Sequence, residues 1–458
     1  MWHNIVSFTS YINTFKFMDE CPRKEKTLLI IHGKLYDLTN FRHPGGDILL
    51  DSNGTDATNI FYSTHPQYVW KMIDTKEFQT SYLHDDNKID TIQKRLNKCG
   101  NYVYDCDFYK ECKKLVENHL KKRSITYGTY FDNCIIGTWT SFWLALCGYT
   151  YSTMIYYEGC ISSCILLGIT WAMGNFNLMH ISMHGGICNN KYIKPFLDST
   201  YTVFSGSATP RWIEKHNHIH HGHINTIKDA DKHASPFLRL HPHQDRRWWY
   251  KYQHIYFPLL AFVNTLSNQF THLKYMMKET KDNGKLREVQ VNRYYLSFSL
   301  WICLAYLYPM YSFGVYKGIC SSLLFQMVGS VWATYNIVIN HIFEQSHTSS
   351  ESYQCSFAKM QIASSCNHYS GSMIMTFLTG GLNHQIEHHM FPSLHCFHLP
   401  LLSKDIRELC KKHNIVYNDL STMSLIRSMH KTLQIYGTCE ETSNLPGLGD
   451  YQSLMSGE

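Results

Sequence analysis

The chain has 458 residues, 44% of them apolar, so it is long enough for two or three domains and too apolar to be mainly disordered. Its formal net charge of +6 at pH 7 is modest. The basic residues cluster beside apolar runs, which favours a phospholipid surface over a nucleic acid as the anionic partner. The 16 cysteines are scattered without a Cys-x-x-Cys pair, as in reduced proteins that face the cytosol. Met1–Phe15 lacks the basic and apolar segments of a signal peptide, so none is expected.

The N-terminal segment has the pattern of a small ligand-binding domain. Residues 28–41 are rich in β-branched and aromatic residues around a glycine-containing turn, which predicts strands. A His-Pro-Gly-Gly motif begins at His43, and a second histidine, His65, follows 22 positions later. The proline and glycines permit a tight turn that brings the backbone close to a flat ligand.

This set of residues resembles a cytochrome b5 haem-binding domain. In that family, the residues that correspond to His43 and His65 are the two axial ligands of haem b. Ligation by two imidazoles leaves iron no open position, which suits electron transfer and excludes oxygen binding. The resemblance implies an α+β haem domain over residues 1–85, joined by a linker of residues 86–125 to the rest of a multi-domain chain.

Four later stretches are apolar enough to be candidates for transmembrane helices, which need about 20 mainly apolar residues. They are Cys134–Tyr151, Cys160–Met179, Tyr295–Phe313 and Gly318–Ile339. Lysine and arginine are dense before the first stretch and between the second and third, whereas Ser152–Glu158 has none. The positive-inside rule therefore places both chain ends and the long central loop in the cytosol. Four buried core helices of a soluble enzyme would not explain this charge asymmetry. The shorter runs Ile255–Val263 and Met373–Leu382 are expected to lie in the membrane interface.

Three clusters of candidate metal ligands lie on the cytosolic side of this topology. Their members are His180 and His184, then His216, His220 and His221, and finally Gln385, His388 and His389. Imidazole is a good neutral ligand of transition metals, and a spacing of four residues places two side chains on one helical face. Repeated pairs at one membrane face therefore predict a polynuclear metal site.

Several polar residues around the second cluster fall outside this ligand pattern. His218 and His223 are interpreted as surface groups or as partners of the ligands. Asp229 and Asp231 follow closely, and carboxylates in such positions orient imidazoles by accepting their second N–H.

The order of the clusters, with Gly-Gly-Leu-Asn-His-Gln-Ile-Glu-His-His-Met-Phe-Pro at 380–392, resembles the membrane front-end fatty acid desaturases that carry a cytochrome b5 domain. The resemblance extends from about Lys26 to about Leu433, and Gln385, where other membrane desaturases have histidine, is typical of this subgroup. It implies an all-α desaturase domain at 126–436, with four transmembrane helices and a cytosolic histidine-rich cap. A polar tail at 437–458 follows.

The same resemblance implies that the eight clustered residues form a catalytic site for two non-haem iron ions. His341, at the end of the fourth apolar stretch, would be a further iron ligand, and His254 is a weaker candidate. Gln385 would ligate weakly or shape the substrate path. Two departures from the family are Ile181, in place of an aspartate, and Ala230, in place of a proline between Asp229 and Asp231.

We therefore expect an O2-dependent oxidoreductase that inserts a cis double bond into a polyunsaturated fatty acyl chain, carried as a CoA ester or a phospholipid. Imidazole-rich sites suit iron, and two ferrous ions can jointly reduce O2. Electrons would pass from NADH-cytochrome b5 reductase through the fused haem domain, which makes their delivery intramolecular. The expected location is the endoplasmic reticulum membrane, crossed several times, with both termini cytosolic and no nucleic acid partner.

Three alternatives remain open at the level of sequence. A sphingolipid Δ8-desaturase shares this architecture, a cytochrome b5-fused lipid hydroxylase has generally different histidine spacing, and a membrane-anchored electron carrier with an inactive desaturase domain would retain only the haem function. A soluble di-iron protein with two Glu-x-x-His motifs fits badly, because Glu344 and His347 form the single pair with that spacing. No motif reports the position of the double bond.

Overall fold

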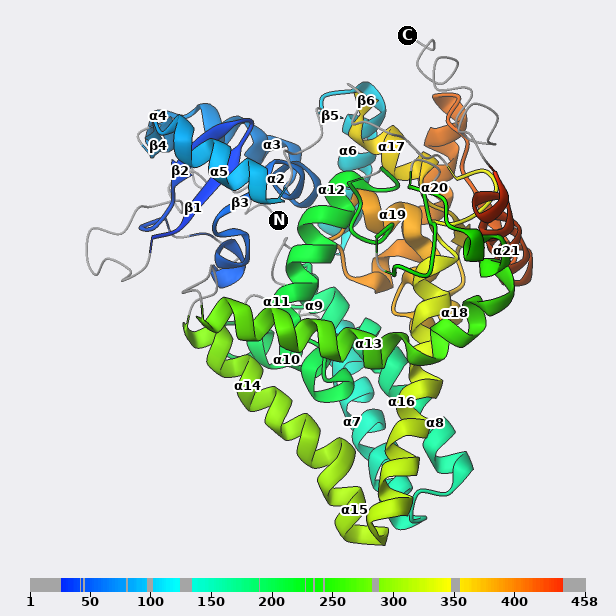
Figure 1. The fold of residues 1–458 in the computed structure, drawn as a ribbon. Coiled ribbons are helices and arrows are strands. Elements are labelled where there is room, and N and C mark those ends of the chain that lie inside the picture. Colours follow the sequence, from blue (N-terminus) through cyan, green and yellow to red (C-terminus); the bar gives the residue numbers. More distant parts are fainter. Residues whose placement is uncertain are drawn as a thin grey trace.

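The computed structural model describes residues 26–41, 43, 46–79, 81–96, 102–123, 134–188, 190–226, 228–233, 235–241, 244–281, 288–346 and 355–439. Within them, a small domain of short strands and helices lies beside a larger helical body, from which long helices extend as a stem (Figure 1). The predictions for Met1–Phe15, His347 and most of the polar tail concern residues outside the described ranges.

The small domain is built around a four-stranded sheet of order β3-β1-β2-β4. Its elements are β1 (Leu28–Ile31), β2 (Lys34–Asp37), η1 (Gly46–Ser52), β3 (Thr55–Asp56), α2 (Thr58–Thr64), α3 (Gln67–Trp70), η2 (Lys71–Asp74), α4 (Lys76–Gln79), β4 (Tyr82–Leu83) and α5 (Asp86–Leu96). β1 and β2 are antiparallel and turn through His32 and Gly33, whose φ values are +51° and +71°. Two positive φ values are typical of a two-residue hairpin turn, and glycine adopts them without steric cost. β1 pairs in parallel with β3, and the predicted α+β fold is confirmed.

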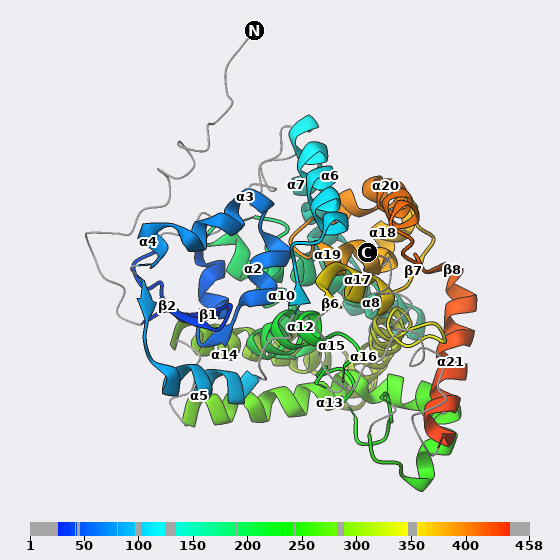
Figure 2. The same cartoon turned by 90° about the horizontal axis from the view of Figure 1, so that it is seen from above.

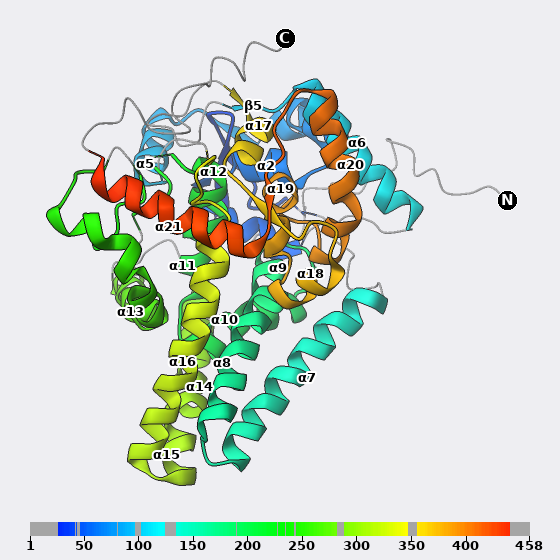
Figure 3. The same cartoon turned by 90° about the vertical axis from the view of Figure 1, so that its right-hand side faces the viewer.

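The stem consists of apolar helices that pack closely along their length. They are α7 (Cys134–Tyr156), α8 (Ile161–Asn175), α14 (Glu288–Ile302), η7 (Cys303–Leu307), α15 (Tyr308–Phe313) and α16 (Val315–Val338), which converge at the tip of the stem (Figures 1 and 3). Where α8 crosses α16, a Cβ on Gly329 would lie 2.8 Å from the carbonyl oxygen of Gly168. Glycine at both positions lets the two backbones approach, as small residues do in membrane helix bundles.

Two helices of the described residues are long and apolar enough to cross a membrane, Ile161–Met183 and Glu288–Phe313. They contain the second and third of the four predicted stretches. The first and fourth stretches are also helical, as α7 and α16, but threonine, serine and tyrosine side chains dilute their apolar content. The prediction of four spans is therefore supported for two of them.

A second set of helices joins the stem to the remainder of the larger helical body, which we call the cap. It comprises η4 (Phe176–His180), α9 (Ile181–Met183), α10 (Ile193–Ser205), α11 (Thr209–Trp212), η5 (Ile213–His220), α12 (His221–His223), η6 (Trp248–Tyr252) and α13 (Gln253–Lys281). α13 lies across the stem where the stem meets the cap (Figure 1). The run Ile255–Val263, predicted to be interfacial, forms its first part, with Ile255 and Leu259 exposed.

The cap is completed by residues 102–122 of the linker and by the C-terminal elements from Cys355 onward. Its elements are β5 (Tyr102–Val103), α6 (Asp107–Lys122), β6 (Cys355–Ser356), α17 (Phe357–Ala363), β7 (Asn367–His368), α18 (Met373–Thr379), η8 (Leu382–His384), α19 (Gln385–Met390), η9 (Cys396–His398), α20 (Leu399–Lys412), β8 (Asp419–Leu420) and α21 (Thr422–Thr438). One continuous apolar core runs from Leu29 in the small domain, through Tyr109 in α6, to Met390 in α19. From above, the small domain lies beside the cap with α2 next to α12 (Figure 2).

Candidate functional site

The three predicted clusters meet where the stem joins the cap. The first lies where α8 continues through η4 into α9, the second on η5 and α12, and the third on α19. Both η4 and η5 are π-helical segments. Such segments are rare and often occur at functional sites, because the wider turn redirects side chains. The rings of His216 and His220 stack on η5 with centroids 5.3 Å apart, and the two residues form a group with Asp231 whose ligand atoms lie within 4.8 Å of one another. Each also belongs to one of the two imidazole groups described next.

The first group of imidazoles, site A, combines all three clusters. Its ligand nitrogens lie within 4.8 Å of one another and belong to His180, His184, His216 and His388. Nε2 of His180 is 3.0 Å from Nε2 of His216. The Nε2 atoms of His184 and His388 are buried without a hydrogen-bond partner among the described residues. An unpaired buried nitrogen is costly, and a bound metal would remove that cost.

The second group, site B, consists of His220, His341 and His389, whose ligand nitrogens also lie within 4.8 Å of one another. Gln385 adjoins them, with Nε2 at 3.1 Å from Nε2 of His341 and at 3.4 Å from Nε2 of His389. Its Oε1 is buried and unpartnered among the described residues. Rotation of the amide by half a turn exchanges the two atoms, and would direct the oxygen, the metal-binding atom, toward both imidazoles.

His221 lies between the two sites. Its Nε2 is 3.3 Å from Nε2 of His216 in site A, and its ring stacks on that of His389 in site B with centroids 4.2 Å apart. Two adjacent groups of buried imidazoles, joined by a further imidazole, form a donor set that suits two transition-metal ions. The residues present therefore fit a dinuclear centre.

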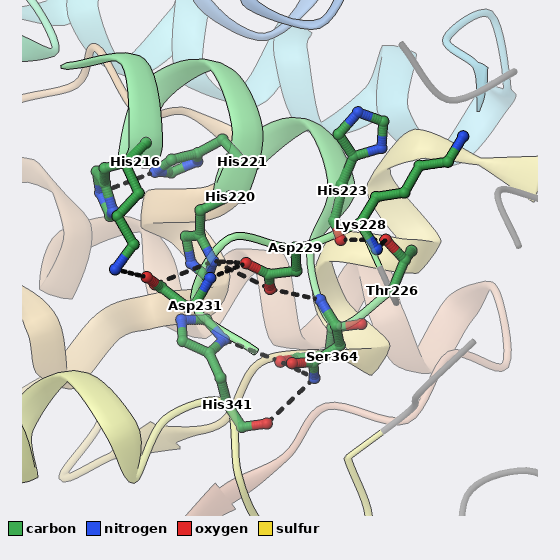
Figure 4. Close-up of polar contacts among 12 residues, drawn as sticks. His216, His220, His221, His223, Thr226, Lys228, Asp229, Asp231, His341 and Ser364 are labelled. Atoms are coloured by element: carbon green, nitrogen blue, oxygen red, sulfur yellow. Dashed lines mark hydrogen bonds and ion pairs between the residues drawn. The ribbon is translucent and has the colours of Figure 1, made fainter. Parts of the chain in front are cut away.

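The imidazoles of site B are held by hydrogen bonds at their second nitrogen, and Figure 4 shows those of His220 and His341. Nδ1 of His220 is 3.0 Å from Oδ1 of Asp229, and Nδ1 of His341 is 3.0 Å from the carbonyl oxygen of Ser364. Nδ1 of His389 lies 2.9 Å from Oε1 of Gln361. An acceptor at Nδ1 fixes the proton there and leaves Nε2 free for a metal.

The sequence predicted only some of the groups that orient these imidazoles. Asp229 and Asp231 were predicted to orient imidazoles, and both face Nδ1 of His220. Gln361 and Ser364 were missed as partners. Gln361 belongs to a stretch that matches the desaturase family, whereas the contact of Ser364 uses a backbone carbonyl, which no side-chain pattern reports.

Burial sets the charge of the imidazoles. It lowers the pKa of His216, His221, His388 and His389 well below the ordinary value of 6.5, and neighbouring imidazoles add to the effect. These rings are therefore neutral, as metal ligation requires. Burial also acts on His220, but the carboxylates of Asp229 and Asp231 outweigh it and raise the pKa of that ring.

The remaining candidate histidines belong to neither site. Nε2 of His218 lies 3.1 Å from the carbonyl oxygen of Asp51, in the small domain. His223 is buried, and its carbonyl oxygen accepts a hydrogen bond from Thr226. His254 is half-buried on α13, outside both sites.

The predicted haem ligands face each other in the small domain. His65 follows α2, with Nδ1 at 2.9 Å from the carbonyl oxygen of Phe61, and its Nε2 is 3.3 Å from Nε2 of His43. Both line a cavity of about 200 Å³ whose walls include Leu38, Phe41 and Phe78. Loss of hydration lowers the pKa of His43 to about 3 and that of His65 to about 4. Two neutral imidazoles in an apolar cavity fit an axially ligated haem.

The haem cavity reaches the metal centre. The same cavity is lined by His184 of site A and by His221. A domain with two facing imidazoles, opening on a buried polyhistidine centre, defines a haem-linked oxidoreductase with a second, non-haem metal site.

Comparison with known proteins identifies the family. The model of the family described as "Fatty acid desaturase" matches residues 159–421, and that of the "Cytochrome b5-like Heme/Steroid binding domain" matches residues 14–83. The chain therefore belongs to the fatty acid desaturase family, with a cytochrome b5-like domain at its N-terminal end. This confirms the resemblance inferred from the sequence. We refer to the small domain below as the haem domain.

Similarity to curated relatives extends over most of the chain. The Delta(5) fatty acid desaturase A of Dictyostelium discoideum is 27% identical over 414 residues, which cover 85% of each protein. The Acyl-lipid (8-3)-desaturase B of the same organism is 26% identical, over 86% of this chain and 88% of its own length. The Delta(6)-fatty-acid desaturase fat-3 of Caenorhabditis elegans is 26% identical, over 82% of this chain and 88% of its own.

Proposed function

We propose that this protein inserts a cis double bond between an existing double bond and the carboxyl end of a polyunsaturated fatty acyl chain. The observation that carries this proposal is the buried pair of imidazole sites, with Gln385 in the third cluster and a haem cavity lined by His184 of site A and by His221. The activities named for the relatives, Delta(5), Delta(6) and (8-3) desaturation, agree with it.

Two non-haem iron ions would occupy the two sites. His180, His184, His216 and His388 would hold one, and His220, His341, His389 and Gln385 the other, with His221 between them. Iron bound there would supply the oxidising power, through joint reduction of O2, to remove hydrogen from an unactivated methylene. The chain's own contribution is to keep the imidazoles neutral and oriented and to exclude bulk water from a centre whose ligands are all buried.

A second cavity provides a candidate path for the acyl chain. It has a volume of about 80 Å³ and lies among α8, α10, α13 and α16, with Trp171, Phe204 and Phe325 in its walls. Met179 and Trp212 line its end near site A, where the Trp212 ring stacks on His216 with centroids 4.9 Å apart. A cavity that ends at Trp212, beside the proposed iron ligand His216, would place one segment of the acyl chain near the metal. Its depth would then determine the position of the double bond.

The stem would cross the endoplasmic reticulum membrane, with α7, α8, α14–α15 and α16 as four spans and both termini in the cytosol. Apolar side chains project from the stem without cover: Leu296 on α14 is 74% exposed and Tyr311 on α15 is 87% exposed. Tyr156, Tyr157 and Tyr316 are also exposed near the tip, as in the aromatic belts of membrane proteins. A contiguous exposed apolar surface of this kind is stable in lipid and not in water.

The electrons would come from NADH through a separate cytochrome b5 reductase and the haem held by His43 and His65. The domain boundaries would follow these roles, with the haem domain at 1–85, the linker at 86–125 and the desaturase domain at 126–436. The acyl substrate would be a CoA ester or a phospholipid.

The test is expression in yeast fed with a panel of unsaturated C18 and C20 fatty acids, followed by gas chromatography and by profiling of sphingoid bases. The proposal predicts a new double bond on the carboxyl side of an existing one, absent from a His388→Ala control. A product confined to sphingoid bases would identify a sphingolipid desaturase instead. If protein fully loaded with haem and iron gave no product from either class, the desaturase activity would be refuted.

A further inference from the structure

Polar contacts link the haem domain to the surroundings of each of the three histidine clusters, directly at the second cluster and through Lys194 or Lys113 at the other two. We propose that these contacts hold the haem domain permanently in one docked pose against the iron centre, with Lys113 of the linker helix as the main positioning residue. The inference rests on the proposed function, because it concerns how the fused haem reaches the iron sites.

The contact with the first cluster is a buried charge network. Nζ of Lys194 lies 3.3 Å from Oδ2 of Asp51 in the haem domain and 2.6 Å from Oδ2 of Asp198. The other oxygen of Asp198 accepts a hydrogen bond of 2.7 Å from Ser182, which lies between His180 and His184. The side chains of Lys194 and Asp198 are only 7% and 5% exposed, so solvent screens their attraction weakly. The network therefore fastens η1 of the haem domain to the helix that carries the first cluster.

The contact with the second cluster is made by Asn59 on α2. Its Nδ2 donates a hydrogen bond of 3.1 Å to the carbonyl oxygen of Gly222, between His221 and His223. The hydroxyl of Tyr104, in the linker, donates to Oδ1 of the same side chain. Both ends of the Asn59 amide are thus occupied and buried, which fixes α2 against α12.

The contact with the third cluster depends on Lys113, which is 1% exposed on α6. Its Nζ donates to the carbonyl oxygens of Ser63 at 2.7 Å and of His65 at 2.9 Å, at the C-terminal end of α2. The same Nζ lies 5.4 Å from the centre of the Phe391 ring, which directly follows α19. Lysine at this position therefore joins the haem-ligand segment to the third cluster, and cations are favoured at helix C-termini.

Neighbouring contacts reinforce this position. Tyr109, one helical turn before Lys113, donates a hydrogen bond of 3.0 Å to the carbonyl oxygen of Met390. The rings of Trp70 and Tyr109 also surround the Lys113 amine, at 5.7 and 5.1 Å. Burial lowers the pKa of Lys113 to about 7, but the neutral amine keeps two N–H groups for the two carbonyls. The two hydrogen bonds to the end of α2 therefore persist in either charge state.

The docked pose explains why one cavity contains both His43 and His65 on one side and His184 and His221 on the other. Each transferred electron would oxidise ferrous haem to ferric haem and reduce one iron ion of the centre. A fixed pose spares the search that a tethered, mobile domain would make before each transfer.

The inference is tested on the full-length holoenzyme. Anaerobically reduced protein is mixed with O2 and an acyl substrate identified by the yeast panel, and oxidation of the haem is followed by stopped-flow absorbance. Lys113→Met should slow this oxidation at least severalfold, because electron transfer weakens steeply with distance and a released haem domain must find the docked pose again before each transfer. Lys114→Met, at an exposed position of the same helix, should leave the rate unchanged. Added soluble cytochrome b5 should restore product formation by the Lys113→Met variant, which would show that its iron centre is intact.

Hydrogen–deuterium exchange provides a readout independent of turnover. The docked pose predicts strong protection of α2 and α12 in the wild-type holoprotein and faster exchange of both in Lys113→Met. Asn59→Ala serves as a milder second variant, with the same direction of change, should Lys113→Met fail to retain haem. Wild-type oxidation rates and wild-type protection in these variants would overturn the docking inference. A wild-type protein whose α2 is protected, but whose haem is not oxidised in the presence of any substrate, would contradict the proposed function and leave the docked pose supported.

Discussion

Asn59 in the haem domain hydrogen bonds directly to the backbone of Gly222, one residue after His221, over a distance of 3.1 Å. A side chain at position 222 would obstruct this contact, since a Cβ there would lie 2.8 Å from Nδ2 of Asn59. The absence of a side chain thus allows α2 to approach the second histidine cluster. The contact links a domain that contains the proposed haem ligands to a segment that contains proposed ligands of the non-haem iron sites.

Gly222→Ala is expected to displace α2 and to slow haem oxidation, because the added methyl group overlaps the Asn59 amide. Iron and haem contents should match those of the wild type, since no ligand changes. Truncating the obstructing side chain, in the double variant Gly222→Ala/Asn59→Ala, should recover part of the rate relative to Gly222→Ala alone. Stopped-flow absorbance with metal analysis measures all three quantities. A double variant slower than both single variants would show that the overlap is not the cause.

The acceptor at Nδ1 of His389 should control metal affinity at site B. Gln361→Leu removes the carbonyl that lies 2.9 Å from that nitrogen, so we expect an affinity for iron about tenfold to a hundredfold weaker. Gln361→Glu keeps an oxygen acceptor for Nδ1 of His389 but, like Gln361→Leu, loses the donor to the carbonyl oxygen of His221, so it should retain more iron than Gln361→Leu does. Iron retained during dialysis against a graded series of chelator concentrations gives the comparison. Equal losses from the two variants would mean that packing, and not the hydrogen bond, sustains the site.

Removal of a ligand from site A should halve the non-haem iron and spare the haem. His184→Ala deletes an imidazole whose Nε2 is buried and unpartnered among the described residues. We expect about half of the wild-type non-haem iron, because site B has its own imidazoles, and an unchanged haem absorbance spectrum. His254→Ala is the matched control, since that histidine lies outside both sites. The two-site assignment fails if His184→Ala retains all of its non-haem iron.

The histidine clusters were readable from the sequence because ligand chemistry leaves a local pattern. The spacing of His180 and His184 reports a shared helical face, and the two residues do share site A. The assignment of His216 to site A and of His220 to site B was not predictable from their spacing, which indicates only a shared helical face, and their rings do stack with centroids 5.3 Å apart. Ser364 acts through its backbone carbonyl, and any residue could provide that group.

The docking of the two domains could not be predicted from the sequence either. Asp51 and Lys194 are 143 positions apart, and their pairing depends on how the surfaces of the two domains meet. The apolar helices of the stem were partly predictable from the sequence. Their presence follows from apolar runs in the sequence. However, α7 and α16 mix apolar residues with hydroxyl groups that bond to the backbone or to neighbouring helices. Ser322, for example, donates a hydrogen bond of 2.7 Å to the carbonyl oxygen of Gly318.

The haem domain should lose stability in acid because its two facing imidazoles are kept neutral. In the haem-free chain the pKa is about 3 for His43 and about 4 for His65, against about 6.5 for each when unfolded. Between these values the unfolded state binds protons that the folded state does not. Stability is therefore complete above pH 6.5 and falls as the pH decreases toward 3, by at most about 1.4 kcal/mol per pH unit for each histidine.

Protons also compete with haem iron for the same nitrogens, so haem should dissociate over the same range. Absorbance of the haem band and denaturant unfolding, both measured from pH 8 to pH 4, check the prediction. Haem retention and unfolding free energy that stayed constant down to pH 4 would show that the two imidazoles are not held neutral.

Close packing of α8 against α16 should be essential for the stem. Gly168 faces the backbone of α16, where an added Cβ would meet the carbonyl oxygen of Phe325 and lie 3.1 Å from the nitrogen of Gly329. Gly168→Leu should therefore force the helices apart and destabilise the protein by about 1–3 kcal/mol, the usual cost of overpacking. Gly148→Leu is the matched control on α7, because nothing lies within 4 Å of a Cβ there. Melting in detergent micelles measures both variants, and iron content reports whether the displacement of α8 reaches His180 at the end of the same helix. Equal melting temperatures for the two variants would mean that α8 and α16 are not in close contact in the membrane-extracted protein.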